Sequence, residues 1–233
     1  DTQGNESTLS FNFSSDTSVV ELEKDSQALL FLHEEDNSYE EDDFSLFIKQ
    51  NSLYNDLEFR YKTIKSSTDF VSDIHCIHST ETPVHSAFSI ALTIKDVAKE
   101  FKSKTQVCSV DAKGNVSCLS STWQGDTLTA KSRSFGNFSA IIDTVAPSLK
   151  IKSFTYDLSQ SKNMSFTVED DLSGVSTYNA FVDGEWVLLE YDPKNKRLTH
   201  FFDGKITKGK HLIELVVEDS VKNEKRLVLE FLR

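Results

Sequence analysis

Hydrophobic and polar residues alternate along most of the chain with the period of two that is typical of β-strands. The clearest case is the segment 85–94, in which Phe88, Ile90, Leu92 and Ile94 fall on one face. Successive side chains of a strand point to opposite faces, so this pattern predicts half-buried strands. The elements predicted in the first part of the chain are strands at 9–13, 28–32, 44–48, 57–61, 85–94, 105–110, 116–120, 127–131 and 138–142, and one short helix at 95–101.

A short linker follows at Asp143-Thr144-Val145-Ala146-Pro147. Pro147 restricts the residue before it to extended conformations and cannot donate a ladder hydrogen bond, so we expect a stiff connection between two domains. Asp183-Gly184 is a strong signal for a tight hairpin, and 193–196 predicts a second turn. The seven strands predicted after the linker cover 148–154, 164–168, 176–182, 185–191, 197–202, 210–218 and 226–232. The chain is therefore predicted to be all-β, with tandem β-sandwich domains of which the second is immunoglobulin- or fibronectin-like.

The two ends of the chain resemble each other. Asp, Asn, Glu, Leu and Phe recur at the same offsets in 1–13 and 219–231. Such repeats are typical of modular arrays. We therefore predict that 1–13 is the terminal strand of a preceding immunoglobulin-like domain, 14–143 a β-sandwich domain and 144–233 an immunoglobulin-like domain, all within a longer protein. Chance similarity between two edge strands is the alternative.

Composition and charge narrow the possible functions. The chain has 17 Phe against 8 Gly and 3 Pro, which suits a strand-rich protein, and its formal net charge is −12. A basic stripe that would neutralise phosphates is missing, and an acidic surface is repelled by anionic lipids. No apolar run approaches the ~20 residues that span a bilayer, and the polar start without Met suggests a mature form or a fragment. We expect no nucleic-acid partner and no membrane insertion.

One group of residues has the side-chain types that bind metals. It consists of His75, Cys76, His78 and His85. A strand places His75 and His78 on opposite faces, which disfavours zinc and favours surface or core histidines. The chain has no His-Glu-x-x-His, no Gly-x-Ser-x-Gly and no phosphate-binding glycine loop. No catalytic residue is therefore predicted.

Two of the three cysteines, Cys108 and Cys118, flank a turn at 111–114. A simple four-residue loop would pair Cys108 with Ser117, so a disulfide between the two cysteines requires a one-residue bulge. Two separate buried thiols are the alternative.

Acidic residues between two predicted strands suggest a calcium site. Asp170 and Asp171 follow a strand, and the fold could bring Asp219 or Asp143 close to them. Calcium binds several carboxylate oxygens, so we predict a site at Asp170, Asp171 and Asp219, with no other cofactor. The alternative is a structural turn, capped through its own backbone by Asp170 or Asp171. The acidic stretch 33–43 lacks the spacing of a calcium loop and is interpreted as a solvated loop.

Aromatic residues of the second domain include Trp186 and Tyr191. Exposed and coplanar rings at these two positions would form a platform for stacking a sugar, and they are the candidate ligand-binding residues. Aromatic residues on neighbouring strands more often serve core or cross-strand packing.

Several segments together resemble a known family. They are Asp143-Thr144-Val145-Ala146-Pro147, Asp170-Asp171-Leu172-Ser173-Gly174-Val175, 182–192 and 196–199 in the second domain, and 47–57, 83–90 and 133–138 in the first. In these segments the chain resembles the C-terminal β-sandwich region of exported lysostaphin-type (LytM-like) zinc metallopeptidases of Bacteroides-like bacteria. The zinc ligands of that family come from a His-x-x-x-Asp segment and a His-x-His segment, and this chain has neither. No catalytic residue can therefore be carried over.

The resemblance implies a non-catalytic accessory region that spaces, positions or targets a cell-envelope peptidase. Its partners would be an upstream catalytic domain of the same polypeptide and also peptidoglycan or a surface protein. Its location would be the periplasm or cell surface of a Gram-negative bacterium. Two alternatives are a surface adhesin or protein-interaction module, which needs an exposed edge or apolar patch, and a carbohydrate-binding module. An enzyme with a site of its own would need a cleft with shifted pKa values, and no candidate is visible.

Overall fold

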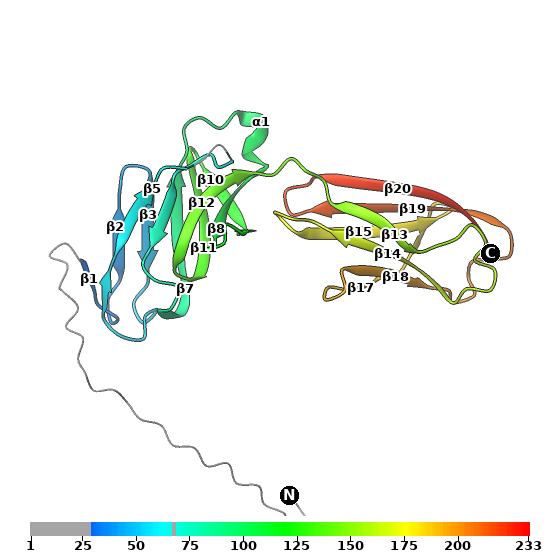
Figure 1. Cartoon of the computed structure of the whole chain (residues 1–233), viewed down its shortest axis with the longest axis horizontal. Coiled ribbons are helices and arrows are strands. Elements are labelled where there is room, and N and C mark those ends of the chain that lie inside the picture. The colour runs from blue at the N-terminus through cyan, green and yellow to red at the C-terminus, as the bar shows by residue number, and fades with distance from the viewer. Residues whose placement is uncertain (1–28, 67–68) are drawn as a thin grey trace, which may run out of the picture.

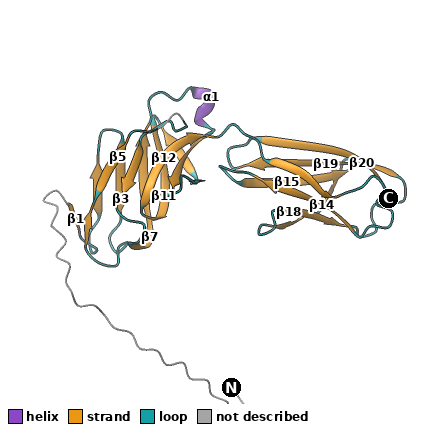
Figure 2. Cartoon of the chain, in the orientation of Figure 1, coloured by secondary structure: helices purple, strands orange, loops and turns teal. Residues whose placement is uncertain are grey.

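The computed structural model describes residues 29–66 and 69–233, and these form two β-sandwiches that follow one another along the chain (Figure 1). Strands make up nearly all of the regular structure, as Figure 2 shows, so the predicted all-β fold class is confirmed. The strand expected at 1–13 lies outside the described residues.

The first sandwich contains two five-stranded antiparallel sheets and a two-stranded ribbon. One sheet has the order β10-β11-β7-β3-β2, formed by Ser121–Gln124, Thr127–Ser134, Pro83–Thr93, Phe44–Ile48 and Asn37–Glu40. The other has the order β5-β6-β12-β8-β9, formed by Tyr61–Ile64, Ile74–Ile77, Gly136–Ile142, Thr105–Val110 and Val116–Cys118. The ribbon pairs β1 (Leu29–Phe31) with β4 (Leu57–Phe59). A single helical turn, α1 (Lys99–Lys102), precedes β8.

The core of this sandwich comes from the alternating positions that the sequence marks. On β7 the buried side chains are Phe88, Ile90 and Leu92, as the period of two predicts. Phe44 and Leu46 of β3 lie on the same buried face, in register with β7. Burying large apolar side chains between two sheets supplies most of the stabilising free energy of such a domain.

The second sandwich consists of two four-stranded antiparallel sheets. One has the order β13-β14-β18-β17, formed by Ser148–Ser153, Asn163–Glu169, Arg197–Phe201 and Glu190–Asp192. The other has the order β16-β15-β19-β20, formed by Glu185–Val187, Val175–Val182, Lys210–Asp219 and Glu224–Leu232. Its core includes Phe166, Leu198, Leu215 and Phe231, all fully buried, and shares no residue with the core of the first sandwich.

The predicted hairpin at Asp183-Gly184 is confirmed. Val182 pairs with Glu185, so two residues form the turn, and both have positive φ (51° and 86°). Two consecutive positive φ angles define the type I′ turn, whose twist matches that of the flanking strands and which Asp-Gly sequences favour. This turn fixes the register of β15 and β16.

Four local predictions are wrong. The segment 185–191 is two strands rather than one, because Val187-Leu188-Leu189 carries the chain from the edge of one sheet (β16) to the edge of the other (β17). Part of the expected acidic loop at 33–43 is strand β2, which pairs with β3. The strand expected at 57–61 is β4 followed by the separate strand β5, and the helix expected at 95–101 is shortened to α1. In the three strand cases the outcome is decided by pairing with a neighbouring strand or by a change of sheet, and a local pattern does not contain that information.

Within the described residues, no helix combines the length and the apolar character needed to span a membrane.

Candidate metal centre at the junction of the two sandwiches

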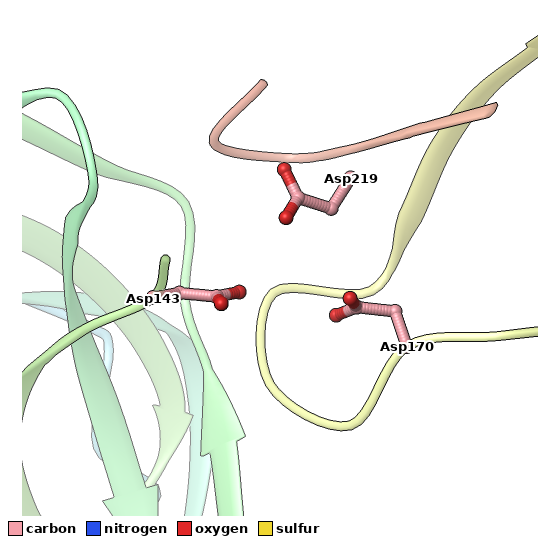
Figure 3. A group of neighbouring side chains, drawn as sticks. All are labelled: Asp143, Asp170 and Asp219. Atoms are coloured by element: carbon pink, nitrogen blue, oxygen red, sulfur yellow. The ribbon is translucent and has the colours of Figure 1, made fainter. Parts of the chain in front are cut away.

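Three aspartates from separate parts of the chain meet where the two sandwiches join (Figure 3). Asp143 comes directly after β12, the last strand of the first sandwich. Asp170 comes directly after β14, and Asp219 is the last residue of β19. We call these three residues the aspartate cluster. It contains one residue of the linker and two residues at one end of the second sandwich.

The carboxylates of the cluster point toward one another. One oxygen from each side chain lies within 4.8 Å of one oxygen from each of the others. Asp143 is 1% exposed and Asp219 is fully buried, whereas Asp170 is partly buried. Three carboxylate oxygens at this spacing surround a volume that suits a single cation.

Backbone N–H groups orient the three side chains. Asp219 Oδ1 accepts hydrogen bonds from the N–H groups of Val221 (2.9 Å) and Asn223 (2.8 Å). Asp170 Oδ1 accepts from Leu172 (3.2 Å) and Gly174 (2.7 Å), which closes the turn after β14. These short-range bonds are the turn-capping role that the sequence offered as an alternative for Asp170, whose carboxylate also points toward the cluster.

Hydrogen bonds also join the two sandwiches across the cluster. Asp143 Oδ2 accepts the N–H of Ser173 at 3.2 Å, and the amide nitrogen of Asn223 donates to the backbone oxygen of Asp143 at 3.0 Å. The same amide donates to Asp219 Oδ2 at 2.7 Å. Lys104 of the first sandwich donates to the backbone oxygen of Val221 at 2.8 Å. The junction is therefore a bonded contact and includes more than the covalent linker.

The cluster carries negative charge without a positive side chain to balance it. In the described ranges 29–66 and 69–233, no Lys, Arg or His forms an ion pair with any of the three carboxylates. Burial raises the pKa of Asp170, and the carboxylates of Asp143 and Asp219 raise it further, against the lowering effect of its backbone hydrogen bonds. Burying carboxylates costs free energy unless a positive side chain or a bound cation compensates their charge.

Two neutral side-chain oxygen atoms at the junction lack a hydrogen-bond partner. The side-chain oxygens of Gln106 and Ser173 are buried and have no hydrogen-bond partner, and both residues line a junction cavity of about 270 Å³. Calcium binds six to eight oxygens, a mixture of carboxylate, carbonyl, amide and water oxygens, whereas zinc prefers nitrogen and sulfur. The ligand atoms of the aspartate cluster itself are all carboxylate oxygens, which suit calcium better than zinc.

The structure brings together two of the three residues predicted for calcium, Asp170 and Asp219. Asp171 is exposed and does not belong to the cluster; Asp143 takes the third position. The sequence marks Asp143 as the start of the linker. Its carboxylate joins the cluster only because the end of the second sandwich that carries Asp170 and Asp219 lies against the linker after β12.

The predicted sugar platform is not formed as expected. Trp186 is 57% exposed, and its ring nitrogen donates to Asn179 at 3.3 Å. Tyr191 is partly buried, because its ring packs against Tyr178 at 5.3 Å beside the second core. The expectation that both rings are exposed is therefore wrong for Tyr191. The exposed apolar neighbours of Trp186 around a cavity of about 500 Å³ are instead Leu188 and Phe201.

The histidine and cysteine group does not converge on a metal. His75 is buried and its Nδ1 lies 2.7 Å from the hydroxyl of Tyr61. His78 has a positive φ of 49° that ends β6, and its Nε2 lies 3.0 Å from the hydroxyl of Thr82. The aspartate cluster is the only group of possible metal ligands among the residues that the structure describes.

Comparison with known proteins bears on the first sandwich. Residues 28–143 match the family model of the Zu5-like domain. The Zu5-like segment thus ends at Asp143, the first member of the cluster. No curated protein matches the chain. The description of the matched family names neither a peptidase nor a bacterial group, so the resemblance to LytM-type peptidases stays a hypothesis.

Proposed function

We propose that this chain is a non-catalytic spacer in which a calcium ion at the aspartate cluster fixes the second sandwich against the Zu5-like segment. The observation that carries the proposal is the convergence of three carboxylates, two of them fully buried, on the point where the sandwiches join. One ligand comes from the end of the first sandwich and two come from the second. A cation bound to all three therefore connects the two domains directly.

The role of such a cation follows from its charge. Without it, mutual repulsion among the carboxylates opposes closure of the junction, and the bonds from Asn223 and Ser173 work against that repulsion. A divalent ion replaces repulsion with attraction, and a ligand at 100 times its dissociation constant stabilises the bound state by about 2.7 kcal/mol. The spacer would be stiff in calcium and more loosely joined without it.

Limited proteolysis of the linker tests this proposal. Val145 is 68% exposed, so elastase, which cleaves after small aliphatic residues, can reach the linker. We expect cleavage at 144–147 to be slow in calcium and at least tenfold faster in chelator. Asp219→Asn should abolish the protection, whereas Asp171→Asn, one residue from the cluster and exposed, should keep it. Equal cleavage of the unsubstituted chain in calcium and chelator would overturn the proposal.

The wider setting that we propose is the accessory region of an exported envelope peptidase of the LytM type. Its support is the sequence resemblance alone. In this setting the chain positions an upstream catalytic domain in the periplasm or at the cell surface. A pull-down with purified peptidoglycan sacculi distinguishes wall targeting from spacing, because saturable binding would indicate targeting and its absence would leave the spacer function.

A second candidate, a protein-interaction module, is favoured by one observation. Trp186, Leu188 and Phe201 are exposed apolar side chains around the same cavity, beside the edge strands β16 and β17. Exposed apolar patches mark interaction sites more often than chance. Trp186→Ala in the sacculus pull-down places any wall binding: loss of binding in the variant would put the wall-binding site on this patch, and retention would place that site elsewhere. The same variant tests the carbohydrate-binding alternative, in which Trp186 stacks on a sugar ring.

A further inference from the structure

Two cysteines lie directly opposite each other on the β8–β9 hairpin. Cys108 pairs with Cys118, Ser109 with Ser117 and Val110 with Val116. The sequence predicted that a four-residue loop would place Cys108 opposite Ser117. The loop instead has three residues and ends in Gly114, whose φ is +83°. A three-residue hairpin loop needs a left-handed residue at this position, and glycine adopts that conformation without strain.

The pair occupies a non-hydrogen-bonded position of the ladder. Leu119 donates to the backbone oxygen of Val107 (2.8 Å), and Asp111 donates to that of Asn115 (3.0 Å). Hydrogen-bonded and non-hydrogen-bonded pairs alternate along an antiparallel ladder, which places Cys108 and Cys118 at a non-hydrogen-bonded pair. Such pairs have Cα atoms about 4.5 Å apart, at the short end of the range of about 4.4–6.8 Å that a disulfide accepts.

The two thiols differ in access. Cys108 is fully buried and its sulfur lies 3.5 Å from the backbone oxygen of Ser139. Cys118 is partly buried and lines the junction cavity together with Ser173 and Val221 of the second sandwich. The third cysteine, Cys76, lies on β6 opposite Lys62 and Asn137 and has no cysteine across from it.

We propose that Cys108 and Cys118 are a site of reversible disulfide formation that closes the β8–β9 hairpin on the junction side of the first sandwich. The co-reactant is a low-molecular-weight disulfide. The thiolate of Cys118 attacks one sulfur of the reagent, which releases one thiol and leaves a mixed disulfide on Cys118. The thiolate of Cys108 then attacks the sulfur of Cys118 and releases the second thiol. The protein loses two protons and two electrons, and the reagent is reduced to two thiols.

Burial should make this exchange slow at neutral pH. Burial, together with the nearby carboxylates of Asp143 and Asp170, raises the pKa of Cys118 to about 11. Burial also raises the pKa of Cys108 to about 12. The thiolate is the attacking species, so the rate should increase about tenfold per pH unit between pH 7 and pH 9.

Mass spectrometry of the whole chain tests the proposal. The folded protein is incubated with oxidised glutathione at pH 8.5, denatured, and alkylated with N-ethylmaleimide. We expect one alkyl group on the unsubstituted chain, at Cys76, and none on Cys76→Ser. Cys118→Ser should take two alkyl groups and form no internal bond. Peptide mapping should place the bond between the peptides that contain Cys108 and Cys118.

Three results would overturn the proposal. They are three alkyl groups on the oxidised chain, glutathione retained on Cys118 without an internal bond, and a bond that includes Cys76. Cys118→Val, which suits a strand, replaces Cys118→Ser if the serine variant does not fold. None of these readouts depends on calcium, so the disulfide and the cation site are tested separately.

Discussion

Removing one charge from the aspartate cluster should have opposite effects with and without calcium. The substitution is Asp170→Asn, which keeps the size and shape of the side chain and a carbonyl oxygen. Its oxygen can still accept the hydrogen bonds from Leu172 and Gly174. The substitution therefore alters the charge of the cluster while preserving the turn after β14.

The magnitude follows from the distances. Two unit charges at the 4.8 Å limit of the cluster repel each other by about 1 kcal/mol in water and about 3.5 kcal/mol at an effective dielectric constant of 20. Asp170 faces two such charges, so its neutralisation relieves at least about 2 kcal/mol of repulsion. The two hydrogen bonds from Leu172 and Gly174 would then be accepted by a neutral amide oxygen instead of a carboxylate, which costs about 1 kcal/mol for each bond. In chelator the variant should therefore be at least as stable as the unsubstituted chain.

In calcium the order should reverse. At 100 times the dissociation constant, calcium should stabilise the unsubstituted chain by about 2.7 kcal/mol. For a chain of this length that corresponds to roughly 5–10 °C in melting temperature. Asp170→Asn lacks one of the three charged ligands, and its calcium-dependent gain at the same concentration should fall below about 1 kcal/mol.

Differential scanning fluorimetry in calcium and in chelator measures both effects, and Asp171→Asn is the matched control. The control should show the full calcium shift, because Asp171 is exposed and outside the cluster. If calcium does not change the melting temperature of the unsubstituted chain, the cation site is refuted. A variant destabilised equally in both buffers would show that Asp170 serves the turn alone.

Three further predictions concern the fold. His211 donates through Nδ1 to Asp183 (2.6 Å) and through Nε2 to the backbone oxygen of Thr207 (2.9 Å), and these bonds raise its pKa while that of Asp183 is lowered. A pKa that is higher in the folded state stabilises the protein at low pH, and this stabilisation is lost as the pH rises through that pKa. In urea denaturation, His211→Asn should therefore cost more stability at pH 5 than at pH 8.5. An equal cost at both pH values would contradict a charged pair of His211 and Asp183. Gly184→Ala should cost about 1–2 kcal/mol in urea denaturation, because Gly184 has a φ of +86°, which strains any residue with a Cβ. A Cβ at this position would meet no atom within 4 Å, so backbone strain is the only cost. An unchanged denaturation midpoint would rule out strain at the turn. Phe166→Ala should destabilise the second sandwich by about 3–5 kcal/mol. In calorimetry it should lower only the melting transition of that sandwich, because the two cores share no residue. An equal drop in the transition of the first sandwich would show that the two sandwiches unfold together.

Local patterns determined the fold class and several individual elements. The alternation of Phe88, Ile90 and Leu92 predicts a strand with one buried face, because a strand repeats every two residues and burial selects apolar side chains. Asp183-Gly184 predicts its turn, because few residue pairs accept positive φ twice in succession. Patterns of this kind involve only a few consecutive residues, so they can be read from a single sequence.

Tertiary structure decided how distant segments meet. The sequence named Asp170, Asp171 and Asp219 as calcium ligands, with Asp143 as a residue that the fold could bring close. Packing of the second sandwich against the end of β12 decides that Asp143, and not Asp171, completes the cluster. In the same way Tyr191 packs beside Tyr178 because β17 joins a different sheet from β16. Cys108 meets Cys118 because Gly114 shortens a loop by one residue. Each outcome depends on a pairing between segments far apart or on a one-residue register, and such pairings are set by the free energy of the whole packed structure rather than by local preference.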